Sequence, residues 1–337
     1  MIYFPFADFW WVYGLFLILV ASLITLDLGV FHKKSHEVGF KEAATWSVVW
    51  IALALLFNVG FYYFSLHEFQ TDPRFLALSN FNPEGVAKQL SLEFLAGYVV
   101  EKTLAVDNLF VFVIIFSYFS IPAKYQHKLL FWGILGALFF RAVFISIGAV
   151  LMQYHEVVVL FGVFLIFTGL KIGFSKDEET NPGDRLFVKW LRKILPMSTR
   201  TDHGHFFVKE NSIWKATPLF LALVVIEVSD IVFAVDSVPA IFAITKEPLV
   251  VFTSNVFAIL GIRSLYFLLA GVIKKFHLLK YGLAVILVFV GLKMVWLNDL
   301  FDGKFPISWS LMIIFGVLLL TGVMSILFPP AGNKGHE

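Results

Sequence analysis

Long runs of apolar residues dominate the chain, and short segments between them carry most of the charged residues. A membrane-spanning α-helix needs about 20 predominantly apolar residues, and the runs predict nine such helices. They are expected at residues 10–31, 43–64, 92–119, 129–152, 157–174, 218–244, 249–273, 281–297 and 307–328. The pattern therefore predicts an all-α polytopic membrane protein.

The composition supports a lipid environment for most of the surface. Of the 337 residues, 59% are hydrophobic and 15% are charged, whereas soluble domains average about 45–50% and about 25%. The mean hydropathy is +0.84. The absence of cysteine excludes a disulfide scaffold, and a net charge of +2 gives no indication of a nucleic-acid partner.

The distribution of Lys and Arg predicts the orientation, because positively charged loops stay in the cytoplasm. If the N-terminus is outside, 17 of the 26 basic residues lie in the inner segments and four in the outer ones. The remaining five lie within the predicted helices. We therefore expect the N-terminus outside and the C-terminus inside.

Two stretches of three helices resemble each other in order. Leu104-Ala-Val-Asp107-Asn matches Phe233-Ala-Val-Asp236-Ser, and two further matches, around Gly136 and Gly261 and around Gly169 and Gly291, follow at offsets of 125 and 122 residues. An odd number of helices in each copy inverts the second copy in the membrane. Inverted repeats are typical of transporters, with the substrate site near the midplane.

The repeats predict a division of the chain into five parts. The long charged segment between the repeats is expected to be a cytoplasmic linker, and its residues 186–195 can be either a basic helix on the lipid surface or a solvated connection. The predicted parts are an N-terminal two-helix segment with an outer loop (1–90), a first repeat (91–174), the linker (175–215), a second repeat (216–300), and a last helix with its tail (301–337).

Carboxylates within the predicted helices are the candidates for function, because an ionisable side chain in the hydrocarbon region costs roughly 2.5–3.5 kcal/mol. Six lie deep: Asp27, Glu101, Asp107, Glu227, Asp230 and Asp236. Three cations face them: Lys102, Arg141 and Arg263. We expect Glu93, Lys171 and Lys293 nearer the helix ends, where the lysines can reach the interface. Ion pairing accounts for three of the six acids, and the others must be protonated, reach water or meet a bound cation.

The spacing of the acids predicts that two of the three in residues 218–244 share a helix face and that the third does not. Glu227 and Asp230 lie on one helix face, whereas Asp236 is rotated about 120° from Asp230 on an ideal helix. Pro239 frees the carbonyl of Val235, so a kinked or unwound stretch there would supply carboxylate and carbonyl oxygens together. Further oxygen donors are available, each of which can instead form ordinary interhelical hydrogen bonds: Asn108, Ser229, Ser237 and Asn255.

The donor types restrict the choice of ion. The chain has no cysteine, and all nine histidines fall in loops or at helix ends. An all-oxygen site suits Mg²⁺, Ca²⁺ or Mn²⁺ rather than copper or zinc. We expect such an ion to be transported as a substrate, with protons as a second partner and no organic cofactor.

Residues 101–112 (EKTLAVDNLFVF) and 227–240 (EVSDIVFAVDSVPA) resemble the two characteristic segments of the TerC/Alx family of bacterial membrane proteins. Leu26-Asp27-Leu28 resembles the first helix of that family, and the likeness extends from Asp27 to Phe328. The resemblance implies a nine-helix protein of the LysE-type transporter superfamily in the inner membrane, which exports divalent metal ions and favours manganese. It also implies a link to alkaline pH and to tellurite resistance, and it assigns ion binding to the six acids named above.

Two other functions compete with transport. Paired acids occur in intramembrane proteases and in metal-dependent prenyl transferases, but the chain lacks a Gly-x-Gly-Asp segment and an Asp-Asp-x-x-Asp run. A membrane scaffold for a stress-resistance complex could use the linker as a docking surface, although it would leave six membrane acids unexplained. We expect a transporter rather than an enzyme, and the sequence leaves the oligomeric state open.

Overall fold

The computed structural model describes residues 2–31, 39–78, 80–174, 196–198, 204–210, 212–269, 278–301 and 305–328. It describes the backbone but not the side chains of residues 27–31, 107, 110 and 236. The region 186–195, where the sequence allows a basic helix, lies outside the described residues.

The described chain is almost entirely helical, and each of the nine predicted segments contains helix. The N-terminal half comprises α1 (Phe6–Phe31), α2 (Phe40–Thr71), α3 (Pro73–Leu76), α4 (Pro83–Tyr118), α5 (Ala123–Leu151) and α6 (His155–Phe174). The C-terminal half comprises β1 (Phe207–Glu210), β2 (Ile213–Ala216), α8 (Pro218–Phe242), α9 (Pro248–Leu260), α10 (Ile262–Leu269), α11 (Leu279–Leu292), the π-helix η3 (Lys293–Leu297), α12 (Asn298–Leu300) and α13 (Ile307–Leu327).

Two long helices begin where the sequence provides both a cap and a proline. The side chain of Asn82 accepts a hydrogen bond from the backbone of Gly85 at the start of α4, and Thr217 caps α8 through Phe220. A proline follows each cap, at a position where the missing N–H costs nothing. These local signals place the starts of the two helices that carry most of the membrane acids.

The helices confirm a polytopic membrane protein. Seven of the described helices are long and apolar enough to cross a membrane, and the count becomes eight if α9 and α10, bent by 41°, form one span. The 36-residue α4 is long enough, but Glu101, Lys102 and Asp107 interrupt its apolar character. The number of nine spans therefore stays a prediction.

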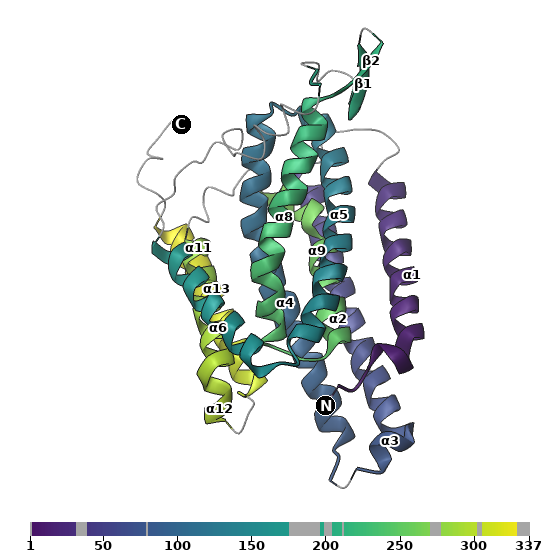
Figure 1. Cartoon of the computed structure of the whole chain (residues 1–337), viewed down its shortest axis with the longest axis vertical. Helices are drawn as coiled ribbons and strands as arrows, with labels where there is room; N and C mark the ends of the chain where they lie inside the picture. Colours follow the sequence, from purple (N-terminus) through teal and green to yellow (C-terminus); the bar gives the residue numbers. More distant parts are fainter. Residues whose placement is uncertain are drawn as a thin grey trace.

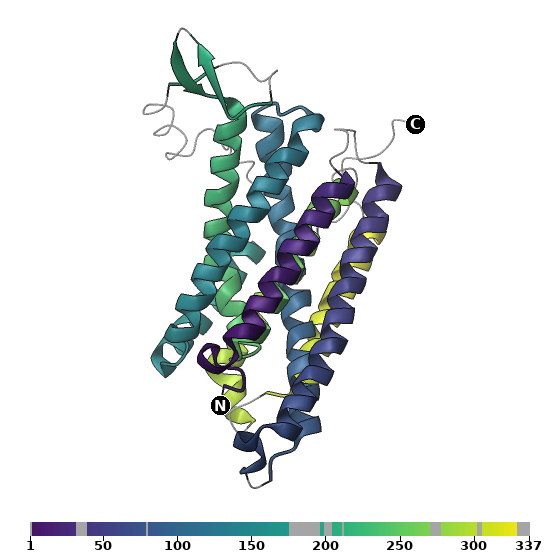
Figure 2. The ribbon, with the colours of Figure 1, turned by 90° about the vertical axis from the view of Figure 1, so that its right-hand side faces the viewer.

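The long helices run between two ends of the molecule (Figures 1 and 2). The N-terminus, α3 and α12 lie at one end, and the β1–β2 hairpin at the other. In Figure 1, α1 lies on one flank and α6, α11 and α13 on the opposite flank, with α4, α5, α8 and α9 between them. The hairpin, which the sequence analysis did not predict, pairs Phe207 with Ala216 and turns at Ser212, whose φ is 65°.

Helices from the two predicted repeats pack on each other in a reciprocal way. The first helix of one repeat contacts the second helix of the other, as α4 contacts α9 and α8 contacts α5. The third helices, α6 and α11, contact each other. A twofold axis relating the repeats would produce this pairing, although the repeat itself stays a prediction.

The stretch before Pro239 is helical, so of the two forms that the sequence allowed, kinked or unwound, the unwound one does not occur. The helix α8 continues through Val235 and Pro239 to Phe242. Pro239 lies in the last turn, where few residues follow that could be displaced, so its ring is accommodated without a break. The Val235 side chain is exposed on the outside of this helix.

Candidate metal-ion site

An arginine at the centre of the bundle joins acids from two helices. Arg141 on α5 is 1% exposed, Glu101 on α4 is 0% exposed, and Asp230 on α8 is 4% exposed. The Nη1 atom of Arg141 forms an ion pair with Oε1 of Glu101. The Nη2 atom of Arg141 lies 3.8 Å from Oδ1 of Asp230. Nη1 also donates to Asn255 Oδ1 on α9 over 3.1 Å. Side chains of four helices therefore meet at one guanidinium group.

The sequence of α5 explains why Arg141 can be buried so deeply. Gly133, Ala137 and Arg141 recur at four-residue spacing on its buried face, which places them on one side of the helix. A Cβ atom at Gly133 would lie 3.1 Å from a methyl group of Ile226 on α8. Small residues thus bring α5 and α8 together and leave the arginine facing the acids.

A third acid lies beside this cluster. The carboxylate of Glu227 occupies the space that a side chain at Gly136 on α5 would fill. Among the described residues, neither Glu227 Oε2 nor Asp230 Oδ2 has a hydrogen-bond partner, although both atoms are buried. Such oxygens retain acceptor capacity that a cation or a proton can use.

The second deep cation bonds to the backbone of a neighbouring helix. Lys102 Nζ donates to the carbonyl oxygen of Ala258 over 3.1 Å, in the last turn of α9. A cation there interacts favourably with the helix C-terminus. It lies beside Gly261, where α9 ends and α10 begins, and Arg263 is buried just beyond this bend.

The structure thus brings some of the predicted residues together. Glu101, Asp230 and Arg141 are in contact, and Asn255 forms the interhelical hydrogen bond that the sequence allowed. Asn108 and Ser237 are buried at 3% and 1% exposure, and their Nδ2 and Oγ atoms have no hydrogen-bond partner among the described residues. The side chains of three predicted acids lie outside the described residues: Asp27, Asp107 and Asp236.

Within the described side chains, no three histidine, aspartate or glutamate residues lie close enough together to hold a metal ion. Arg141 explains part of this arrangement, because its guanidinium group lies between Glu101 and Asp230. Those two carboxylates can share a bound cation only if the arginine moves.

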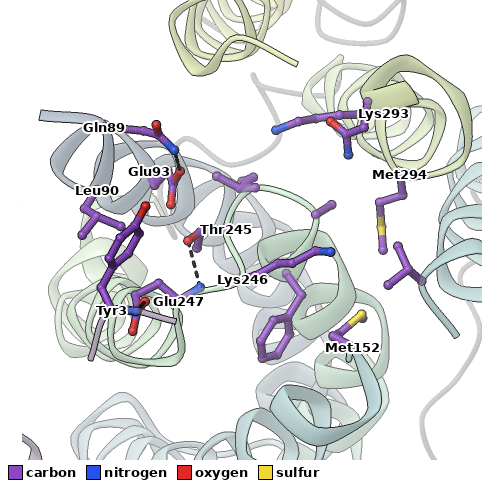
Figure 3. Close-up of a pocket in the computed structure, with 15 residues that line it drawn as sticks. Tyr3, Gln89, Leu90, Glu93, Met152, Thr245, Lys246, Glu247, Lys293 and Met294 are labelled. Atoms are coloured by element: carbon purple, nitrogen blue, oxygen red, sulfur yellow. Dashed lines mark hydrogen bonds between the residues drawn. The ribbon is translucent and has the colours of Figure 1, made fainter. Parts of the chain in front are cut away.

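A polar cavity at the N-terminal end of the bundle was missed by the sequence analysis (Figure 3). Its volume is about 360 Å³, and its lining includes Glu93, Glu247 and Lys293, which are only 1%, 3% and 2% exposed. Lys293 therefore does not reach the lipid interface as expected, in contrast to its counterpart Lys171, which is exposed. Glu247 stands in a short connection with no apolar periodicity, so no sequence pattern indicated its burial.

The N-terminal segment closes one side of this cavity. Glu247 accepts hydrogen bonds from the backbone N–H groups of Tyr3 and Phe4 over 2.7 and 3.1 Å. Burial, with a smaller contribution from Glu93, raises the pKa of Glu247 to about 7 despite these two bonds. The nearby Glu93 accepts from Gln89 Nε2 over 2.7 Å.

Comparison with known proteins gives consistent matches over most of the chain. Residues 86–331 match the family described as "Integral membrane protein TerC family". The chain is 45% identical to the "Putative membrane-bound redox modulator Alx" of Escherichia coli strain K12 over 315 residues, 93% of each chain. It is 46% identical to the "Uncharacterized membrane protein STKORF319" of Myxococcus xanthus over 313 residues, 93% of this chain and 91% of that protein. No solved structure matches. The protein with this buried Glu101–Arg141–Asp230 cluster therefore belongs to the TerC family of integral membrane proteins.

Proposed function

We propose that the protein exports divalent metal ions, with manganese as the preferred ion, across the bacterial inner membrane. The transport site is assigned to the acids around Arg141, which lie on α4 and α8. These two helices come from different predicted repeats, and substrate sites of inverted-repeat transporters lie where the repeats meet.

One observation carries this proposal: a single guanidinium group stands between two buried carboxylates, and a third carboxylate lies one helical turn away. Arg141 can neutralise only one of Glu101, Asp230 and Glu227. The deep cation on α4, Lys102, is bonded to a backbone carbonyl group instead. A buried excess of negative charge is costly unless protons or a cation balance it.

Arg141 has a defined role in this proposal. In the absence of metal it neutralises part of the site, and an entering divalent ion must displace it from Glu101 and Asp230. Arginine and metal then compete for the same oxygens. Export would end when the guanidinium group returns and displaces the ion.

The oxygen ligands and the family likeness support manganese. Carboxylate and amide oxygens suit Mn²⁺, Mg²⁺ and Ca²⁺, and the preference for manganese among them comes from the resemblance to the TerC family. Protons are the proposed coupling partner, because acids around an empty site repel one another and take up protons.

The name of the Alx relatives refers to redox modulation. This chain contains no cysteine, so a redox role here would not use thiol–disulfide exchange. The metal ion itself is the redox-active species that the proposed transport provides.

The decisive experiment measures Mn²⁺ flux into proteoliposomes. We expect wild-type protein to transport Mn²⁺ and Asp230→Asn to lose at least 90% of the flux, because the variant removes one of the three carboxylate charges of the proposed site. Glu84→Gln, at an exposed acid in the first turn of α4, is the matched control and should transport normally. Normal flux by Asp230→Asn, or no flux by the wild type, would contradict the proposal.

A further inference from the structure

The cavity at the N-terminal end lies between elements of both halves of the molecule. Its walls are the start of α4, the end of α5, the connection between α8 and α9, and η3. Figure 3 shows Lys246 extending across it, between Tyr3 and Glu247 on one side and Met152 and Met294 on the other. No residue of this cavity belongs to the site around Arg141.

The cavity is lined by four charged side chains, two of each sign. Two nearly inaccessible acids, Glu93 and Glu247, share it with the buried Lys293 and the exposed Lys246. Burial of charged groups costs several kcal/mol each unless other interactions compensate. Lys293 also begins a π-helix, a rare conformation that occurs frequently at functional sites. These features indicate a polar passage rather than a packing defect.

One face of α4 connects the cavity with the site around Arg141. Glu93, Gly97 and Glu101 follow at four-residue intervals, so they lie on the same face and about 6 Å apart along the helix axis. Glu93 lines the cavity, whereas Glu101 binds Arg141. Gly97 stands between the two acids.

The connection is closed at Gly97. A Cβ atom there would lie 2.8 Å from Ser254 Oγ on α9 and 3.6 Å from Ile241 on α8, so the helices are in direct contact. The next residue on α9 is Asn255, which binds Arg141. The ring of Phe242, which lines the cavity, packs against α5 at Gly148.

We infer that this cavity is the vestibule through which the metal ion leaves the site around Arg141, and that the contact of Gly97 with Ser254 is the gate between them. This inference rests on the proposed function. Glu93 is the first carboxylate that the ion meets beyond the gate. Lys246 and Lys293 prevent long retention there, because their charges compete with the ion for the acids.

The test uses the absence of cysteine in the chain, which makes any introduced cysteine the only thiol. Lys246→Cys places a thiol at an exposed position on the cavity wall, and Ala77→Cys is the control at an exposed position in the loop after α3. Each protein in proteoliposomes is treated from the N-terminal side with a bulky, membrane-impermeant thiol reagent, and Mn²⁺ flux is measured. Mn²⁺ binding is measured on the same labelled proteins in detergent.

The bulky label on Lys246→Cys should lower Mn²⁺ flux at least tenfold and leave Mn²⁺ affinity within twofold, whereas labelled Ala77→Cys should be unaffected. When Lys246→Cys is treated instead with an aminoethyl reagent, which rebuilds a side chain similar to lysine, it should keep the flux of the wild type. Ala243→Cys, also on the cavity wall, provides a second position in case the first variant folds poorly.

Undiminished flux by fully labelled Lys246→Cys and Ala243→Cys would overturn the vestibule while leaving the proposed transport intact. Unlabelled protein that neither binds nor transports Mn²⁺ would overturn the proposed function, and the vestibule with it. As an independent measurement, Glu93→Gln should lower flux at least threefold without changing Mn²⁺ affinity, and equal flux in Glu93→Gln and Glu84→Gln would contradict the role of Glu93.

Discussion

Gly162 on α6 and Gly291 on α11 lie backbone to backbone, with no room for a side chain at either position. A Cβ atom at Gly162 would be 3.1 Å from the carbonyl oxygen of Gly291, and one at Gly291 would be 2.6 Å from that of Gly162. The sequence offset of 122 residues relates Gly169 to Gly291, and it therefore relates Gly162 to Ala284. A Cβ atom at Gly169 would indeed lie 2.7 Å from the Ala284 carbonyl oxygen, so the two close contacts are those that a twofold axis would exchange.

Gly291→Ala should destabilise the protein by about 1–3 kcal/mol, because the added methyl group forces two backbones apart where no flexible side chain can yield. Thermal unfolding in detergent measures the effect. Gly316→Ala on α13 is the matched control, since nothing lies within 4 Å of its added Cβ atom. An equal melting temperature in the two variants would contradict the close contact of α6 with α11.

Glu101→Gln should destabilise the fold by about 3–5 kcal/mol, because it leaves the buried Arg141 without its nearest charge partner. The double variant Glu101→Gln with Arg141→Gln should recover much of this loss, since the unpaired charge is gone. Chemical unfolding of the three proteins tests the coupling. If the double variant is as unstable as the two single changes added together, the ion pair is not the cause.

Asp107→Asn and Asp236→Asn test the two acids at matched repeat positions. Each change keeps the shape and one oxygen but removes the charge, so Mn²⁺ binding and transport should be lost while the melting temperature stays within a few degrees. Flux and thermal unfolding of the same preparations separate this outcome from a structural role. A variant that transports normally, or that recovers when a nearby arginine is neutralised, would contradict a shared ion site.

The stability of the N-terminal end should depend on pH through Glu247. Its pKa rises from an ordinary 4.5 to about 7 in the folded protein, so the folded state holds a proton that the unfolded state releases between these values. Stability should therefore increase as the pH falls from 7 to 4.5, by up to about 3 kcal/mol. Glu247→Gln should remove this dependence, and an unchanged slope of melting temperature against pH would show that another group is responsible.

Removal of residues 177–201 should leave metal binding near normal, because the linker has the charge pattern of a solvated connection and no predicted ligand. Mn²⁺ binding to the purified variant is the measurement. Complete loss of binding by well-folded protein would place part of the site or its gate in the linker.

Much of the helical fold could be predicted, because a bilayer requires long apolar segments and their lengths are visible in the sequence. The acids of the candidate site could be found for the same reason, since charged residues within such segments are rare. What periodicity could not predict is which neighbour each charge contacts: Arg141 meets Glu101, 40 residues away, through a contact between helices. Lys293 lies near a predicted helix end, where a lysine can reach the lipid interface. It faces a cavity instead because of the way η3 packs, which the sequence does not reveal.

Glu101 and Lys102 are consecutive residues on α4, and consecutive residues of an α-helix point about 100° apart. Glu101 therefore holds α5 through Arg141, while Lys102 holds the end of α9 at the same height. These two polar contacts at one level, on different sides of the helix, oppose a rotation of α4 about its own axis. When a metal ion displaces Arg141, the contact of Lys102 with α9 is the one of the two that remains. Binding of the ion would then release a rotation of α4, and the same rotation would swing Gly97 away from Ser254, one turn along the helix.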